Sequence, residues 1–343
     1  MRALLLSMLV LTAGRVSGGD WRQCTALPDM EGFAGCFAGI SHGALLVAGG
    51  ANFPDAKPWD GGKKVWYDTV FVLERPNGSW KRAGKLLRPL GYGVSVSHGE
   101  GVVCVGGSNA DGHYADAFRL EWKGGQLQTT RLASLSQTLA NACGAVVGDT
   151  LYIAGGQSKP DSTTTMKAAW KLDLSADSPE WTAIEAWPGR ARMLSVAAGQ
   201  GDTFWLVGGT DLLTASEGKV ERQYLKDAYR YRPGDGWRRI ADLPHAVVAA
   251  PSPAPTDATG FYIVGGDDGG QIGVPPDGHQ GFLKQVLRYD VAKETWIPAG
   301  EAAVARVVTP CVRWGQAWVI PSGEVRPAVR SPQVWSWTIG HNE

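Results

Sequence analysis

The stretch from Ile320 to Trp337, IPSGEVRPAVRSPQVWSW, concentrates groups that can move protons and hold anions. Glu324 and Arg330 lie six residues apart, with Pro327 between them. Because proline fixes one backbone angle and interrupts strand pairing, we expect a stiff loop here. Such a loop can aim a carboxylate, which exchanges protons, and a guanidinium, which holds anions through paired N–H groups, at one ligand.

This stretch stands where a repeated pattern would come next. An apolar run ending in Gly-Gly occurs at 45–50, 102–107, 151–156, 204–209 and 261–266, and WVIPSG (318–323) falls one period later. The spacing of about 50 to 57 residues is typical of kelch-type β-propeller blades. A short strand follows each glycine pair, and in most repeats a tryptophan strand comes next, at Trp80, Trp181, Trp237 and Trp296. Each repeat is therefore predicted to be a sheet of four antiparallel strands.

The two ends of the chain complete the count of blades. The sixth repeat has a third strand at 332–339 and no tryptophan strand after it, whereas WRQCTAL (21–27) reads as an outer strand without a blade. We expect this N-terminal strand to complete the sixth blade, which closes the ring and removes free sheet edges. The predicted fold is an all-β, six-bladed kelch-type propeller, with residues 19–343 as one domain.

The geometry of a propeller predicts where polar residues meet. The first strand of each blade lines the central channel, and the second returns to the same face, so residues entering the first and following the second share one mouth. Those residues include Arg88, Asn141, Arg192, His245 and Arg306 on entry, and Asn52, Ser108–Asn109, Gln157–Ser158, Thr210–Asp211, Asp267–Asp268 and Glu324 after the second strand. We take Arg88, Asn52, Asn141, Arg192 and Arg306 as candidate ligands of a small, acidic, hydroxyl-rich molecule. The arginines can instead tie one blade to the next, and Asp267–Asp268 can simply form turns.

The bulk composition narrows the function classes. The chain has 33 basic and 33 acidic residues, which does not suggest a nucleic-acid or anionic-membrane partner. None of its five cysteines lies in a CxxC pair, and no histidines show metal-ligand spacing, so we expect no metal site. Cys104 and Cys143 lie in apolar strand patterns, where a buried, unreactive role is expected.

The first residues are typical of an export signal. Arg2 precedes the apolar run 3–13, and the small residues 16–18 suit a cleavage site near Gly18. Residues 1–18 are therefore predicted to be a signal peptide, and the protein periplasmic or secreted; a buried N-terminal strand is the alternative. No other apolar run is long enough to cross a membrane.

Three segments resemble one enzyme family. GEVRPAVR (323–330) is similar to the GEAKPGLRT-type loop of the bacterial N-acetylneuraminate epimerases, the sialic acid mutarotases. Residues 33–73, which contain AGGANFP, resemble a second segment of that family, and YGVSVS (92–97) a third. Because the AGGANFP blade comes first here and the GE..P...R loop last, the chain resembles the cyclically permuted mutarotase branch. It departs from the family pattern at Ala328, usually glycine, and Ser331, usually threonine.

The resemblance implies isomerisation of a sialic acid at its anomeric carbon, without a cofactor. The family's catalytic glutamate corresponds to Glu324 and its partner arginine to Arg330. On this basis we expect Glu324 to act as general base and Arg330 to grip the sugar carboxylate, with Arg88, Arg192 or Arg306 assisting. The alternatives are a mutarotase or epimerase of another sugar and a non-catalytic kelch module that binds glycan or protein. A copper oxidase built on a kelch propeller is disfavoured, because its His and Tyr ligand arrangement is missing.

Overall fold

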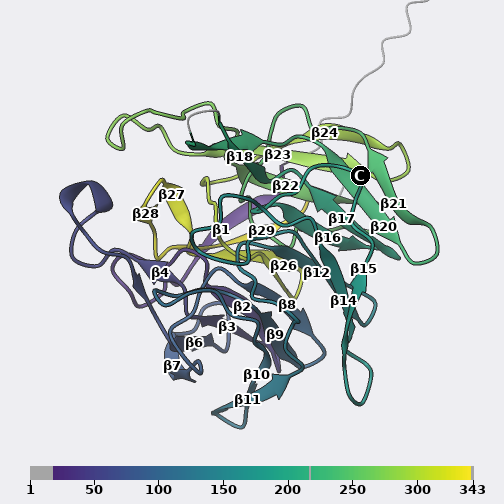
Figure 1. The fold of residues 1–343 in the computed structure, drawn as a ribbon. Coiled ribbons are helices and arrows are strands. Elements are labelled where there is room, and N and C mark those ends of the chain that lie inside the picture. The colour runs from purple at the N-terminus through teal and green to yellow at the C-terminus, as the bar shows by residue number, and fades with distance from the viewer. Residues whose placement is uncertain (1–17, 216–217, 341–343) are drawn as a thin grey trace, which may run out of the picture.

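A computed structural model describes residues 18–215 and 218–340 of the chain. Regular structure in these residues is β-strand, apart from one short 3-10 helix, η1 (Pro58–Asp60). The strands form six sheets, the blades, which are arranged around one axis (Figure 1), and this confirms the predicted six-bladed β-propeller. The predicted signal peptide lies outside the described residues, except for Gly18.

The first four blades each contain four antiparallel strands in chain order. The first consists of β2 (Phe37–Ser41), β3 (Ala44–Ala48), β6 (Thr69–Leu73) and β7 (Lys81–Lys85). The second consists of β8 (Val94–His98), β9 (Gly101–Val105), β10 (Ala117–Lys123) and β11 (Gln126–Leu132). The third consists of β12 (Cys143–Val147), β13 (Thr150–Ala154), β14 (Ala169–Asp173) and β15 (Trp181–Ile184). The fourth consists of β16 (Val196–Gln200), β17 (Thr203–Val207), β20 (Ala228–Arg232) and β21 (Gly236–Ile240).

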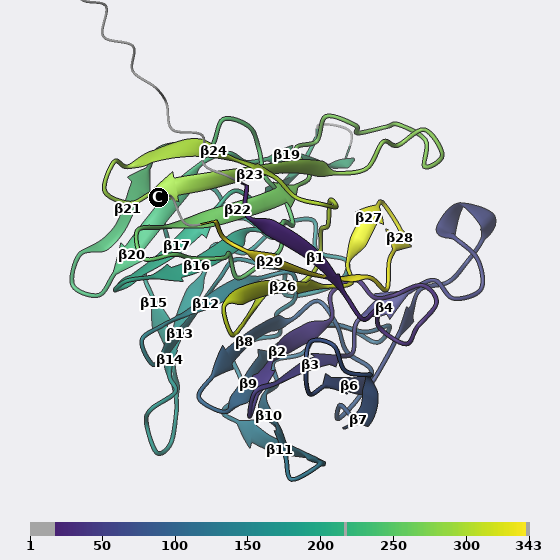
Figure 2. The same cartoon turned by 180° about the vertical axis from the view of Figure 1, so that it is seen from behind.

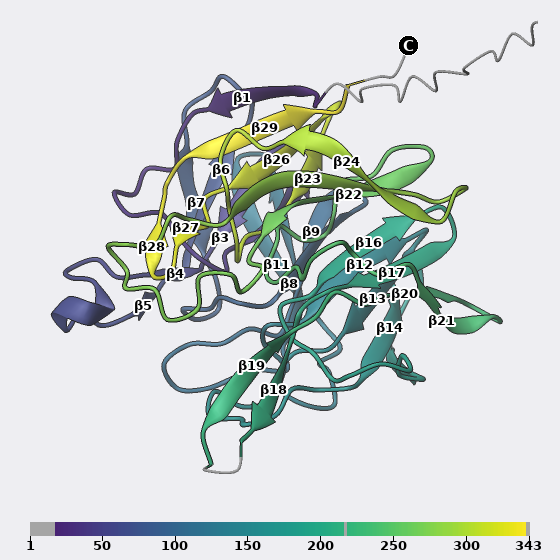
Figure 3. The ribbon, with the colours of Figure 1, turned by 90° about the horizontal axis from the view of Figure 1, so that it is seen from above.

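The sixth blade joins the two ends of the chain. It contains β25 (Val312–Trp314), β26 (Ala317–Pro321) and β29 (Val334–Thr338), and its outer strand is β1 (Asp20–Cys24). Trp21 of β1 pairs with Trp337 of β29, and the two indole rings stack with centroids 5.3 Å apart. Figure 3 shows β1 lying beside β29, which in turn lies beside β26. The predicted closure of the ring by the N-terminal strand is confirmed.

The fifth blade differs from the prediction of four strands per repeat. It contains only β22 (Gly260–Gly266), β23 (Leu283–Asp290) and β24 (Thr295–Glu301). The segment that would form its inner strand carries Pro251, Pro253 and Pro255. A proline has no N–H to donate to a strand ladder, so three prolines in five residues leave only an isolated bridge between Thr256 and Phe261. The prediction was wrong for this strand, although the prolines were visible in the sequence.

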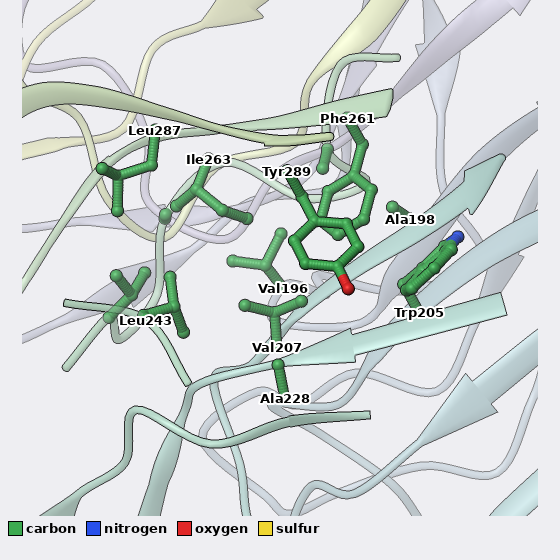
Figure 4. Close-up of a cluster of buried hydrophobic side chains, with 13 residues drawn as sticks. Val196, Ala198, Trp205, Val207, Ala228, Leu243, Phe261, Ile263, Leu287 and Tyr289 are labelled. Atoms are coloured by element: carbon green, nitrogen blue, oxygen red, sulfur yellow. The ribbon is translucent and has the colours of Figure 1, made fainter. Parts of the chain in front are cut away.

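Neighbouring blades pack through apolar side chains and through tryptophan hydrogen bonds. Figure 4 shows one such contact, where Trp205 of the fourth blade packs against Phe261 of the fifth, with ring centroids 5.2 Å apart. Burial of side chains of this size stabilises a fold by about 1.5–3 kcal/mol each. The predicted tryptophans each donate an indole N–H to a carbonyl of the preceding blade, over 2.6–2.9 Å, as in Trp80 to Thr25, Trp181 to Ala133, Trp237 to Glu185 and Trp296 to Ala241.

Three short hairpins extend beyond the second strands of their blades. They are β4 (Ala51–Asn52) with β5 (Val65–Trp66), β18 (Thr210–Thr214) with β19 (Val220–Tyr224), and β27 (Glu324–Arg326) with β28 (Val329–Arg330). Figures 1 and 2 show β4 and the β27–β28 hairpin on the same side of the molecule. All five cysteines are free thiols. The described residues include no helix of the length and apolarity that a membrane span requires.

Candidate active site

One residue at the inner start of each blade has a left-handed backbone conformation. We call this set the axial ring; its φ angles are 54–63°, and its members are Gly35, Tyr92, Asn141, Leu194, Ala249 and Val308. The amide N–H of each donates to the carbonyl oxygen of the equivalent residue in the preceding blade, over 2.7–2.8 Å. A left-handed conformation costs a non-glycine residue about 1–2 kcal/mol. The closed circle of hydrogen bonds offsets that cost and fixes the centre of the propeller.

A second six-fold set lies directly beside the axial ring. In each blade, the residue before the ring position forms a bridge with the residue that follows the diglycine. The residues after the diglycine are Ala51, Ser108, Gln157, Thr210, Asp267 and Glu324. The two chain positions therefore do meet at one mouth, and Glu324 is the member that the sixth blade contributes.

A cavity of about 490 Å³ adjoins the axial ring. This volume lies within the range of about 300–1,000 Å³ that is usual for small-molecule sites. Neutral polar side chains in its wall are Ser108, Asn109, Asn141 and Gln157. The ionisable side chains in its wall are Lys64, Tyr92, His113, Arg222, Asp267 and Glu324. Such a wall can hydrogen-bond a polyol and bind an anion.

Glu324 and Arg330 face each other across the β27–β28 hairpin. They are paired in its register, and Arg330 Nη2 lies 2.8 Å from Glu324 Oε1. The Glu324 side chain is 15% exposed, whereas that of Arg330 is 2% exposed and lies over the Phe53 ring, 4.6 Å from its centroid. Within the described part of the chain, Arg330 Nε and Nη1 have no hydrogen-bond partner. Arg330 thus lies behind Glu324, and its donors are only partly used.

Burial controls the protonation of Glu324. Removal from water raises the pKa of Glu324, while the positive charges of Arg330 and Lys64 oppose that rise. A carboxyl whose pKa is moved toward neutrality exchanges protons more effectively near physiological pH. Glu324 therefore combines access to the cavity with the properties of a general base.

Ser322 explains how the sixth repeat manages without its first glycine. Its φ of 60° matches the left-handed conformation of the first glycine in the other pairs, such as Gly49 at 63°. Its buried hydroxyl accepts a hydrogen bond from Phe33 N–H over 2.6 Å and donates one to Ser331 O over 2.8 Å. The serine ties both ends of the charged loop to the blade, which holds Glu324 in place.

Two of the predicted ligands lie between blades instead of facing the cavity. Arg192 is fully buried, with Nη2 2.7 Å from Asp227 Oδ2 and Nη1 donating to Gly208 O over 2.9 Å. Arg306 is also buried and donates to Ser331 Oγ and Gln333 Oε1 over 3.1 and 3.0 Å. Burial lowers the pKa of Arg306 to about 10. Both arginines precede the axial ring by two residues, a position that points between blades.

The remaining predicted ligands divide between the cavity and the framework. Asn141 belongs to the axial ring and lines the cavity, where its Nδ2 lies 3.2 Å from Gln157 Oε1. Arg88 lies outside the cavity wall, 3.3 Å from Asp116. Asn52 is buried, donates to Gly32 O over 2.9 Å and accepts from Tyr67 OH over 2.8 Å. Of the five predicted ligands, the structure brings only Asn141 to the cavity beside Glu324.

The structure also brings in cavity residues that our sequence analysis did not select. Lys64 and Arg222 reach the cavity from the β4–β5 and β18–β19 hairpins, while Tyr92 comes from the axial ring and His113 from the loop after β9. A signal for Tyr92 was available, because it begins the YGVSVS segment. Lys64 and Arg222 lie on hairpins and His113 on a loop, and the repeat pattern does not predict the paths of these segments. Within residues 18–215 and 218–340, no group of three or more His, Cys, Asp or Glu side chains could hold a metal ion.

Comparison with known proteins agrees with the resemblance of the N-terminal blades. Residues 13–129 match the family model described as N-acetylneuraminate epimerase. Over 107 residues, the chain is 47% identical to the N-acetylneuraminate epimerase of Salmonella typhimurium and 48% identical to that of Salmonella arizonae; each alignment covers 27% of both chains. The Yersinia pestis epimerase is 44% identical over 107 residues, 28% of this chain and 27% of its own. The alignments thus span about a quarter of the relatives' length. The resemblance to this family is confirmed for this part of the chain, which does not include Glu324 or Arg330.

Proposed function

We propose that this protein, like the N-acetylneuraminate epimerases that it resembles over residues 13–129, interconverts the anomers of a sialic acid. The observation that supports this most is Glu324, a partly buried carboxylate with a raised pKa in the wall of a cavity at the propeller axis. Since fold alone never establishes function, the proposal depends on this site.

The chemistry requires a base and a donor. Opening a pyranose hemiketal removes a proton from the anomeric hydroxyl and gives one to the ring oxygen. Rotation about the exposed keto carbon, followed by reclosure, produces the other anomer. Glu324 is the group that we propose as the base, because its carboxylate lines the cavity and its pKa is raised. The reaction needs no redox group or nucleotide.

In this proposal Arg330 and Arg222 have different roles, one beside the base and one toward the substrate. Arg330 is paired with Glu324 and almost fully buried, which suits a residue that positions the base. Arg222 is exposed in the cavity wall and forms no ion pair with another described residue, so it suits the sugar carboxylate better. This assignment modifies our expectation from the sequence, in which Arg330 gripped the carboxylate.

The decisive experiment follows freshly released α-N-acetylneuraminate by NMR, with and without the protein. The proposal predicts a faster approach to the β anomer in its presence. An unchanged rate would contradict the proposal, and acceleration of an aldose instead would support a mutarotase of another sugar. Normal activity of Glu324→Gln would exclude Glu324 as the base.

We also propose that the protein is exported, to the periplasm or out of the cell. Arg2 and the apolar run 3–13 support this proposal. Expression of the full chain in a Gram-negative host, followed by fractionation and mass spectrometry, tests it. We expect the exported form to begin near Gly19, and an uncleaved cytoplasmic protein would contradict the proposal.

A further inference from the structure

Lys64 is an ammonium group held among three aromatic rings at the cavity. Its Nζ lies 5.2 Å from the centroid of the Tyr92 ring, 5.4 Å from that of Trp66 and 5.9 Å from that of Phe53. The rings favour a cation at this point through their π faces. Lys64 lines the same cavity as Glu324, and within the described residues it forms no ion pair. A positive charge without a carboxylate partner therefore lies in the same cavity as the proposed base.

The other ionisable groups of the cavity are poorer proton donors. Burial raises the pKa of Tyr92 to about 12 and lowers the pKa of His113, so the phenol holds its proton tightly and the imidazole is mostly neutral at pH 7. Arg222 does not give up a proton in proteins. Asp267 accepts hydrogen bonds, from Tyr224 OH over 3.0 Å and from Gly269 N–H over 2.9 Å. Among the ionisable groups in the cavity wall, Lys64 is therefore the most suitable proton donor.

We propose that Lys64 is the proton donor of the ring-opening step, the counterpart of Glu324. This inference rests on the proposed function, because it assigns the acid in that reaction. It also assigns a role to the β4–β5 hairpin, which carries Lys64 to the mouth that the β27–β28 hairpin shares. The acid thus comes from the first blade and the base from the sixth, and these two blades are neighbours in the closed ring.

The proton transfers balance without another reactant. The Glu324 carboxylate takes the proton of the anomeric hydroxyl, and that oxygen forms the keto C=O bond. The bond between the anomeric carbon and the ring oxygen breaks, and its electron pair takes a proton from the Lys64 ammonium. The intermediate then lies beside a neutral Glu324 carboxyl and a neutral Lys64 amine. Reclosure returns each proton to the group from which it came, and both residues regain their initial charge.

The electrostatics agree with this assignment. Lys64 is exposed as a residue, but the partial removal of its ammonium from water at the cavity lowers its pKa, and Arg330 lowers it further, while Glu324 opposes both effects. A donor must be protonated, so activity is lost as pH rises through the lowered pKa of Lys64. A base must be ionised, so activity is lost as pH falls through the raised pKa of Glu324. We therefore expect a bell-shaped dependence of activity on pH, with the active range shortened at both its acidic and its alkaline end.

The test compares Lys64→Arg and Lys64→Met with Lys63→Met, the matched control at the adjacent exposed lysine outside the cavity wall. Anomer exchange of N-acetylneuraminate is followed by NMR as a function of its concentration and of pH. We expect both Lys64 variants to lose about 10²–10⁴-fold in kcat with little change in KM, since arginine keeps the charge but cannot donate. The alkaline limb should disappear, and Lys63→Met should match the wild type.

The outcomes separate this inference from the proposed function. A wild-type protein that does not accelerate exchange overturns the proposed function and the inference with it. An active wild type together with an active Lys64→Arg overturns only the inference, because the charge then suffices. A rise in KM at unchanged kcat in Lys64→Met also overturns it, since the ammonium then binds the substrate instead of donating a proton.

Discussion

Two buried arginine–carboxylate pairs in this molecule have different roles, one in the framework and one at the candidate active site. Arg192 and Asp227 lie between the third and fourth blades, with Nη2 and Oδ2 2.7 Å apart. Arg330 and Glu324 lie at the axial cavity, with Nη2 and Oε1 2.8 Å apart. Arg192 uses Nε, Nη1 and Nη2 as donors to protein oxygens, whereas Arg330 Nε and Nη1 have no partner among the described residues.

The carboxylates of the two pairs respond differently to burial. Burial alone would raise the pKa of Asp227, but hydrogen bonds from Arg192 and Tyr229 lower it below its usual value. At Glu324 burial raises the pKa, and Arg330 and Lys64 only oppose it. Asp227 is therefore locked in its ionised form, while Glu324 can take up and release a proton. Here the structural pair differs from the reactive one in how many of its arginine N–H groups have a hydrogen-bond partner.

The largest effect is expected at the reactive pair. Glu324→Gln keeps the size of the side chain and an acceptor for Arg330 but removes the base, so the rate of anomer exchange should fall by about 10²–10⁴-fold. Asp267→Asn, at the equivalent position of the fifth blade, is the matched control and should lose less than about tenfold, because its carboxylate is engaged by Tyr224 and a turn. Equal losses in the two variants would remove the distinction between these positions.

Substitution in the structural pair should change the stability of the protein instead of the rate of anomer exchange. Arg192→Met leaves Asp227 buried without its charge partner, which should lower the free energy of unfolding by about 3–5 kcal/mol in urea titrations. Arg88→Met breaks the more exposed pair with Asp116 and should cost about 0–1 kcal/mol. If Arg192→Met folded as stably as Arg88→Met, the Arg192–Asp227 pair would not be holding the blades together.

Removal of the arginine from the reactive pair should change the pH profile. Arg330→Met deletes the nearest positive charge that opposes the rise in the pKa of Glu324. The acid limb of the activity profile should then move to higher pH, and kcat/KM measured between pH 4 and 9 reports this shift. If the acid limb stayed at the same pH in Arg330→Met, Arg330 would not be controlling the protonation of Glu324.

The smallest effect is the pH dependence of stability, which should have opposite signs at the two carboxylates. The pKa of Glu324 is raised on folding, so its protonation stabilises the folded state. This contribution to the free energy of unfolding is fully present below the ordinary pKa of a glutamate and is lost as pH rises through the raised pKa. Because the pKa of Asp227 is lowered, its contribution is present above its ordinary pKa and lost as pH falls through the lowered one. Denaturant titrations across pH should show that Glu324→Gln removes the first slope and Asp227→Asn the second. Parallel curves for both variants would contradict these opposite shifts.

The sequence predicted the framework better than the wall of the site. Repeated diglycines and the unpaired Trp21 strand predicted six blades and their closure, because these features depend on local backbone geometry. Glu324 was also placed at the mouth, since it directly follows the turn of the second strand. The sequence does not reveal that Arg192 and Arg306 lie between blades, because the axial ring, two residues farther on, has a different residue type in each blade. Lys64 and Arg222 lie on hairpins whose paths depend on tertiary contacts, which the repeat pattern does not contain.

The central claim is that an incompletely satisfied ion pair at the propeller axis catalyses anomer exchange. Two-dimensional exchange NMR of an equilibrated N-acetylneuraminate solution tests it most directly, because it detects interconversion without net reaction. With wild-type protein, cross-peaks should link the H3 signals of the two anomers, and with Glu324→Gln they should fall to the level of the protein-free sample. Cross-peaks of equal intensity in all three samples would contradict the account.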